Sequence, residues 1–239
     1  MITRTAFALL LAFSLPAAAQ SLADLPFDQQ LTLAKVGDID AQLSVAEAYE
    51  NGDAEGGVNG AEAAKYYRLA ALQGNVEAQY RLARIVAKGV KGLKLDHGTA
   101  AKLYLDAATK GHLGAMNALG QLYQNGQGVK ADQTKAIEWY TKAADGKLAD
   151  AENNLGVMYL SGKGVTRDLG QAFKLFERAA AQGDGWGLNN LGGMYEMGWG
   201  TAKNPAKALE LYQQALAKGN AVASENIKRL TPAKPLTTP

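Results

Sequence analysis

Small and apolar residues recur along this chain in one pattern, spaced by 36–37 residues. A small residue is followed four positions later by an apolar–small pair, and three positions after that pair usually by a Tyr. The three clearest copies run over residues 115–123, 151–159 and 187–195, and two less regular copies begin at Ala41 and Ala78. A fixed period in this range predicts a solenoid of stacked repeats, a fold that presents a long surface to a partner.

Each copy predicts two helices joined by a glycine-containing turn. In the fourth copy, the small and apolar positions counted from Ala151 fall on one face of a helix. Residues 172–180 give a second apolar face, and the glycines of residues 161–168 between them permit the positive φ that ends a helix. We therefore expect an all-α fold of hairpins, each made of a helix A, a turn and a helix B.

One position of helix A holds only small residues, which indicates that helices A and B touch closely there. Glycine inside a helix costs about 1 kcal/mol against alanine, so a steric need is the simplest reason for it. The five residues are Ala46, Ala83, Gly120, Gly156 and Gly192. Bulky residues of helix B are expected to fill the layer between hairpins, and these are Tyr67, Tyr104, Trp139, Tyr140, Phe176 and Tyr212.

Residues 1–19 have the pattern of a secretory signal peptide. Arg4 supplies a positive start, an apolar run of about ten residues follows, and three alanines ending at Ala19 make a cleavage site. The run is shorter than the roughly 20 residues that span a bilayer. We expect cleavage after Ala19, a mature chain that starts at Gln20, and a periplasmic location without membrane insertion.

The remaining chain divides into a solenoid and its ends. Residues 37–219 are predicted to form the repeats, with capping helices over residues 20–36 and 220–230. Caps of this kind keep the terminal repeats of a solenoid soluble. Residues 231–239 contain three prolines and are predicted to be disordered.

Composition narrows the classes of partner. The formal net charge of +2 falls near +1 once Arg4 is removed, with acids and bases interspersed, which disfavours nucleic acid and anionic membranes as partners. The chain has no Cys, so an exported form must be stabilised by its core alone.

The repeat motif resembles a known family. Residues 115–144 carry Ala-x-x-x-Leu-Gly-x-x-Tyr, then Gly-Gln-Gly-Val, Asp132 and a helix B with Trp139-Tyr140, and this string is similar to the Sel-one-like repeat, a relative of the tetratricopeptide repeat. The resemblance covers about residues 37–220 and departs from the motif at residues 198–202, where a Val is lost. It implies a right-handed α-solenoid of about five helix-turn-helix repeats with helical caps, acting as an adaptor in protein complexes.

The sequence contains no recognisable motif of catalytic residues. His97 and His112 are the only histidines, and no cluster has the spacing of a metal site. None of the serines lies in a Gly-x-Ser-x-Gly elbow, and Gly162-Lys163-Gly164 lacks the other residues of a phosphate loop. We therefore expect a protein that is not an enzyme and that holds no cofactor and no metal.

Helix A residues that point away from the core predict a partner-binding groove, because helix A lines the concave face in tetratricopeptide-like solenoids. The predicted groove residues are Tyr80, Arg81, Arg84, Lys88, Asn117, Gln121, Asn153, Asn154, Trp186, Asn189 and Asn190, with Asp150 in the same register. Amides offer the donors and acceptors that an extended peptide backbone needs, and Arg81 with Arg84 suits a carboxylate. The alternatives are a solvated ion pair between Glu77 and Arg81, and Asn residues that merely belong to the repeat.

Three functions are compatible with this sequence. The first is a periplasmic adaptor or regulator that binds a protein or an extended peptide in the groove. The second is an immunity protein that neutralises a toxin delivered to the periplasm. The third is a hydrolase of cell-wall or β-lactam substrates, although family members described in that way carry paired cysteines in each repeat.

Overall fold

A computed structural model of the chain describes residues 21–54 and 56–231. The predicted signal peptide and the predicted disordered tail from residue 232 onward lie outside the described residues. Within them the chain forms a 3-10 helix, η1 (Leu22–Asp24), and twelve α-helices without a strand. The helices are α1 (Phe27–Lys35), α2 (Ile39–Asn51), α3 (Gly60–Leu72), α4 (Val76–Lys88), α5 (His97–Thr109), α6 (Leu113–Asn125), α7 (Gln133–Asp145), α8 (Ala149–Ser161), α9 (Leu169–Ala181), α10 (Gly185–Met197), α11 (Pro205–Ala217) and α12 (Ala223–Leu230).

Helix ends follow the repeat. All five A helices (α2, α4, α6, α8 and α10) end at a glycine in the left-handed conformation, as at Gly162 with φ of 69°. All five B helices (α3, α5, α7, α9 and α11) begin after an Asp or Asn whose side chain accepts a hydrogen bond from the first turn. The turn chemistry therefore sets each hairpin locally, and the predicted all-α repeat fold is confirmed.

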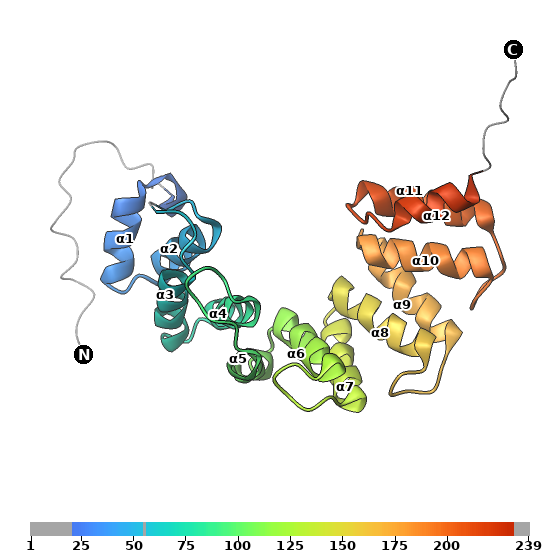
Figure 1. The fold of residues 1–239 in the computed structure, drawn as a ribbon, viewed down its shortest axis with the longest axis horizontal. Coiled ribbons are helices and arrows are strands. Elements are labelled where there is room, and N and C mark those ends of the chain that lie inside the picture. Colours follow the sequence, from blue (N-terminus) through green and yellow to red (C-terminus); the bar gives the residue numbers. More distant parts are fainter. Residues whose placement is uncertain (1–20, 55, 232–239) are drawn as a thin grey trace, which may run out of the picture.

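The hairpins follow one another along an open arc, with α1 and α2 at one end and α11 and α12 at the other (Figure 1). Each helix packs against the next one along the chain, and α8 also contacts α10 directly. In the green part of the arc, α5 and α7 lie outside α4 and α6 (Figure 1). A side-chain hydrogen bond from Asn154 on α8 to Asn117 on α6 joins the other pair, so the A helices α6, α8 and α10 form a row of neighbours from successive repeats.

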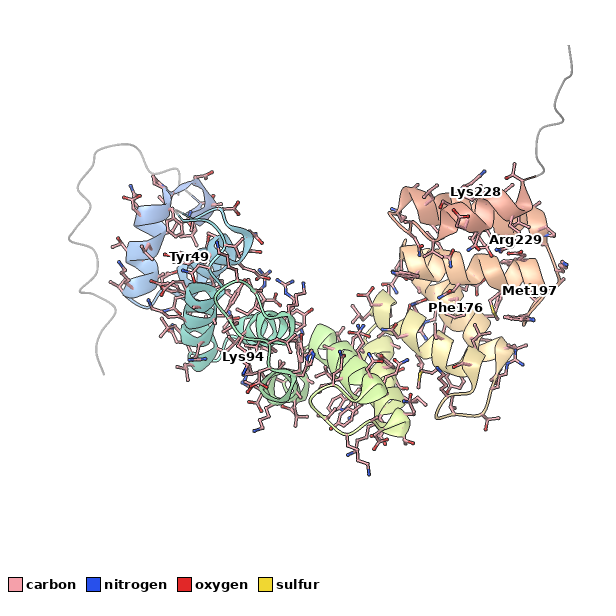
Figure 2. The ribbon with its side chains drawn as sticks, viewed as in Figure 1. Tyr49, Lys94, Phe176, Met197, Lys228 and Arg229 are labelled. Atoms are coloured by element: carbon pink, nitrogen blue, oxygen red, sulfur yellow. The ribbon has the colours of Figure 1, made fainter. Side chains whose placement is uncertain are left out.

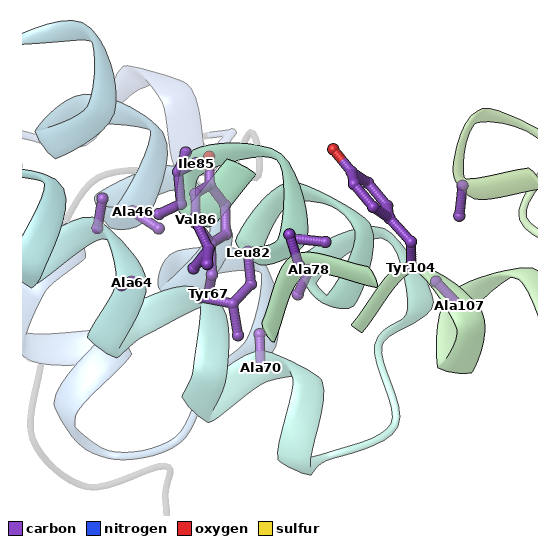
Figure 3. Close-up of a cluster of buried hydrophobic side chains, with 14 of the residues drawn as sticks. Ala46, Ala64, Tyr67, Ala70, Ala78, Leu82, Ile85, Val86, Tyr104 and Ala107 are labelled. Carbon is purple, nitrogen blue, oxygen red and sulfur yellow. The ribbon is translucent and has the colours of Figure 1, made fainter. Parts of the chain in front are cut away.

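The core is built mostly from alanines, and large side chains such as Tyr67, Tyr140 and Tyr212 fill the spaces between them. In the first repeats, Tyr67 and Leu82 lie among alanines such as Ala46, Ala64 and Ala78 (Figure 3). A Cβ atom built on Gly120 would lie 2.5 Å from the ring of Tyr140, and one on Gly192 would lie 2.8 Å from the ring of Tyr212. The close approach of helices A and B that the small residues predict is therefore present.

One packing prediction needs correction. Trp139 was expected to be buried between hairpins, yet it is only partly buried, whereas the adjacent Tyr140 is fully buried. Neighbouring residues on a helix point about 100° apart, so one of the two must leave the core. The Trp139 ring instead makes a cation–π contact with Lys142, whose ammonium nitrogen lies 4.2 Å from the centroid of the indole ring.

Candidate functional site

The row of helices α6, α8 and α10 carries a cavity of about 460 Å³. Its lining consists of Gln121 from α6, Asp150, Asn153, Asn154 and Val157 from α8, and Trp186 and Asn190 from α10. Five of the eleven predicted groove residues therefore meet at one place, and Asp150 and Val157 complete the lining. A concave site with amides, one carboxylate and one indole can hold part of a polar, extended ligand.

The Asn residues form a ladder between successive A helices. The Nδ2 of Asn154 donates to Oδ1 of Asn117 at 3.0 Å, and the Nδ2 of Asn190 donates to Oδ1 of Asn153 at 2.7 Å. A third rung joins Asn226 to Asn189 at 2.8 Å. Part of the hydrogen-bonding capacity of these amides thus holds the repeats in register, which is the structural role that the sequence left open.

The ladder leaves other amide groups available in the cavity. Each rung uses one N–H and one carbonyl oxygen, while a primary amide has two N–H groups and an oxygen with two lone pairs. Asn117 and Asn189 are buried below the surface, with exposed fractions of 7% and 9%. Asn154 and Asn190 are only partly buried and keep their carbonyl oxygens for a ligand.

Asp150 is the charged residue of this lining. Burial raises the pKa of its carboxyl group above the ordinary value, and the negative charge of Asp184 raises that pKa further. Asp184 itself caps α10 by accepting a hydrogen bond from the N–H of Gly187 at 2.6 Å. The cavity is therefore electronegative and contains no cationic side chain in its lining.

The predicted basic pair on α4 is not free. Arg81 lies 2.5 Å from Glu77 and 2.6 Å from Glu47, and Arg84 lies 2.8 Å from Glu50. The predicted alternative of an ion pair with Glu77 is thus present, and two further carboxylates come from the preceding repeat. Arg81 and Arg84 tie α4 to α2, which weakens the case for them as a carboxylate-binding patch.

The two other predicted residues on α4 have different surroundings. The ring of Tyr80 stacks on that of His112 with centroids 4.3 Å apart, and it lies 5.9 Å from the ring of Tyr104. Lys88 is exposed in the last turn of the helix. Neither belongs to the lining of the α6–α8–α10 cavity, so the structure separates the α4 group from the amide group.

Charge reversal on α4 is expected to cost stability. Replacing both Arg81 and Arg84 by Glu places new carboxylates beside Glu47, Glu50 and Glu77, so we expect a loss of about 1–3 kcal/mol in urea unfolding. Lys174→Glu, on the exposed side of α9, serves as the control and is expected to stay within about 0.5 kcal/mol. Equal unfolding curves for both variants would contradict the ion-pair network.

Residues 21–54 and 56–231 contain no group of three or more His, Cys, Asp or Glu side chains placed to hold a metal ion. Across the same residues, every helix is too short or too polar for a bilayer span.

The sequence predicted which face of helix A each of these residues occupies, but not which residues of the next repeat it contacts. It missed Val157, which has no polar signal, and it missed the ladder and the α2–α4 ion pairs. The sequence spacing could have predicted these contacts. The ladder partners are 37 residues apart and the ion-pair partners of α2 and α4 are 34 apart, and both spacings are close to the repeat length.

Solved structures with the same architecture are known. The chain is 30% identical to a Sel1 repeat protein from Oxalobacter formigenes, with a TM-score of 0.73. The match covers 86% of this chain and 59% of that one. The chain is also 26% identical to c5321, a protective antigen present in uropathogenic Escherichia coli strains and displaying an SLR fold, with a TM-score of 0.66. That match covers 86% of this chain and 51% of c5321. This chain thus spans between half and three fifths of those two proteins.

A more distant likeness concerns the fold alone. The immunity protein PA5088 from Pseudomonas aeruginosa is 18% identical, with a TM-score of 0.51, and the match covers 89% of this chain and 80% of that one. No curated protein sequence matches the chain significantly.

The repeat family itself matches along most of the chain. The Sel1 repeat matches residues 39–75, 76–112, 114–148, 149–184 and 187–220, which correspond to the five hairpins. The described residues form those hairpins, with α1 before the first and α12 after the last, and with the close helix contacts described above. The chain therefore belongs to the Sel1 repeat family.

Proposed function

We propose that this protein is a periplasmic adaptor or regulator that binds an extended segment of a partner protein across α6, α8 and α10. Sel1 repeat proteins mediate interactions between proteins. The observation that carries the proposal is the cavity of about 460 Å³ formed by three consecutive A helices. Its lining combines free amide groups, a carboxylate and an exposed indole, and these suit the alternating N–H and C=O groups of an extended backbone.

The site favours a polypeptide over a small substrate. Three repeats contribute to the lining, and the amides recur along the solenoid at the repeat spacing. An extended chain has polar groups at regular intervals and can satisfy such a row, whereas the described residues offer no nucleophile with an adjacent base in this cavity. The periplasmic location rests on the signal-peptide pattern of residues 1–19.

The experiment begins with capture of partners by the chain that starts at Gln20, followed by titration calorimetry with the purified partner. The double variant Gln121→Ala/Trp186→Ala removes two exposed lining side chains, so we expect at least a tenfold loss of affinity, or about 1.4 kcal/mol. The matched control Gln171→Ala/Lys174→Ala removes two exposed side chains of α9, outside the cavity lining, and should bind like the wild type. Equal affinities for both double variants would place recognition elsewhere.

The immunity role differs from the adaptor role only in the identity of the partner. If the captured partner is a toxin and the variants above lose affinity for it, the same surface acts in neutralisation. If the partner is an envelope protein without toxicity, the adaptor role holds.

A further inference from the structure

Asp150 differs in its surroundings from the equivalent residues of the other repeats. The position just before the small residue of helix A holds an exposed Asp40 on α2, Glu77 on α4, Gly114 on α6, Asp150 on α8 and Trp186 on α10. Glu77 is satisfied, because Arg81 lies 2.5 Å and His112 2.9 Å from its carboxylate. Asp150 has no cation within ion-pairing distance among the described residues, so its charge faces the cavity without a counterion.

Aromatic rings lie at the positions equivalent to Asp150 in both neighbouring repeats. On α6 the equivalent residue is Gly114, and a Cβ atom there would lie 3.1 Å from Cζ of Tyr80 and 3.1 Å from Cε1 of His112, so these two rings occupy the space beside it. Trp186, at the equivalent position of α10, is 53% exposed and lines the same cavity. An exposed indole is the best aromatic partner for a cation within about 6 Å of its ring.

The remaining polar atoms are mostly acceptors. The carbonyl oxygens of Asn154 and Asn190 are left over by the ladder, because both residues use an N–H to donate to the preceding repeat. An ammonium or guanidinium group offers several donors and no acceptor, and so it matches one carboxylate together with amide oxygens. Burial and Asp184 both raise the pKa of Asp150, and a bound cation would offset that penalty.

We propose that the cavity between α6, α8 and α10 selects a basic side chain, Lys or Arg, within the extended partner segment, with Asp150 as the counterion and Trp186 as the aromatic wall. This inference rests on the proposed function and adds a specificity to it. Backbone recognition by the amides and side-chain recognition by Asp150 are separable, and each has its own test.

The first test is selection from a random dodecapeptide library displayed on phage, with the immobilised chain from Gln20 onward as the target. We expect enrichment of peptides with Lys or Arg at one shared position. Selection on Asp150→Asn should lose this preference. The matched control is Asp40→Asn, because Asp40 occupies the same first-turn position of α2, is exposed, and lies outside the cavity lining.

The second test is a double-mutant cycle with the most enriched peptide, synthesised with a fluorescein label. Changing its basic residue to Ala should weaken binding to the wild type by about tenfold or more, and binding to Asp150→Asn by less than about twofold. Thermal melts establish that Asp150→Asn is folded, and its melting temperature should equal or exceed that of the wild type because the charge is partly desolvated.

The outcomes separate the two proposals. Enriched peptides without a preference for Lys or Arg, or a cycle without coupling to Asp150, would overturn the basic-residue specificity and leave peptide binding standing. Absence of any enrichment would overturn both. An equal loss of preference in Asp40→Asn would assign the effect to overall charge and also overturn the assignment to Asp150.

Discussion

Replacing Arg178 by Met is expected to lower the free energy of unfolding by about 2–3 kcal/mol. Glu152 on α8 is only 1% exposed, and its carboxylate accepts hydrogen bonds from Arg178 Nε at 2.7 Å and from Gln182 Nε2 at 2.8 Å. Breaking a buried pair costs about 3–5 kcal/mol because a charge is left buried without its partner. The lower figure applies here since the side chain of Arg178 is 48% exposed and water reaches it. Urea unfolding followed by circular dichroism measures the change.

The chain supplies its own control for this prediction. Other repeats hold Met116 and Leu188 at the position of Glu152, so the stack accommodates an apolar residue there. The double variant Glu152→Met/Arg178→Met removes both charges and should recover most of the loss, as replacement of a buried pair by apolar residues often does. A double variant as unstable as Arg178→Met alone would mean that Arg178 acts through its hydrogen bond to the carbonyl of Ala144, at 2.7 Å, and not through the ion pair.

The fold was predictable because the repeat signals are local. Apolar periodicity set the helices, and an Asp or Asn before each B helix and a glycine after each A helix set their ends. The contact between Gly156 and Phe176 was also predictable, since only small residues occupy that position in all copies. The choice between Trp139 and Tyr140 was not, because adjacent aromatic residues differ by about 100° in direction and either can enter the core.

A hydrogen bond inside the hairpins shows what comparison of the copies can add. The hydroxyl of Tyr67 donates to Glu50 at 2.9 Å, that of Tyr140 to Gln124 at 2.7 Å, and that of Tyr212 to Glu196 at 2.7 Å. Where the helix B aromatic residue is Phe176, which has no hydroxyl, Leu160 holds the corresponding helix A position. In the second repeat Ala87 holds that position although Tyr104 has a hydroxyl, so a polar partner accompanies the hydroxyl in three of the four repeats with a Tyr.

The site was only partly predictable, because its polar contacts join different repeats. The Asn residues were recognised as exposed on helix A, but their ladder depends on how far each hairpin is shifted against the next. The same shift brings Glu50 to Arg84 and, at the other end, Glu196 to Arg229, which is labelled on α12 in Figure 2. Sequence periodicity fixes which face a residue occupies, whereas the stacking geometry decides whether its charge is already paired.

That distinction identifies Asp150 as the residue to test. On α4 the equivalent carboxylate has two partners, and on α2 the equivalent Asp40 is exposed to solvent outside the lining of the α6–α8–α10 cavity. Only in the cavity does such a carboxylate combine partial burial with the absence of a counterion among the described residues. A folded protein that retains an uncompensated charge in a concave site has given up some stability, and binding is a physical reason for doing so.

Replacing Gly156 by Leu is expected to have the largest effect of any variant considered, a loss of more than about 3 kcal/mol. A Cβ atom at this position would lie 2.6 Å from Cε1 and 2.9 Å from Cδ1 of Phe176, a fully buried ring labelled in Figure 2. Overpacking a dense core costs about 1–3 kcal/mol for small insertions, and an isobutyl group here must separate α8 from α9. Gly156→Ala should fall within that lower range, because Ala46 and Ala83 are accommodated opposite Tyr67 and Tyr104 in the first two repeats.

A second helical glycine provides the matched control. Gly170 lies in the first turn of α9, is exposed, and a Cβ there would approach only Oδ1 of Asp168, at an ordinary 3.4 Å. Gly170→Ala should therefore stabilise the protein by about 0.5–1 kcal/mol through helix propensity alone. Thermal melts of the three variants separate the steric cost from the backbone gain. If Gly156→Leu melts at the wild-type temperature, α8 and α9 are free to move apart, and the small residue of each repeat is not needed for their close contact.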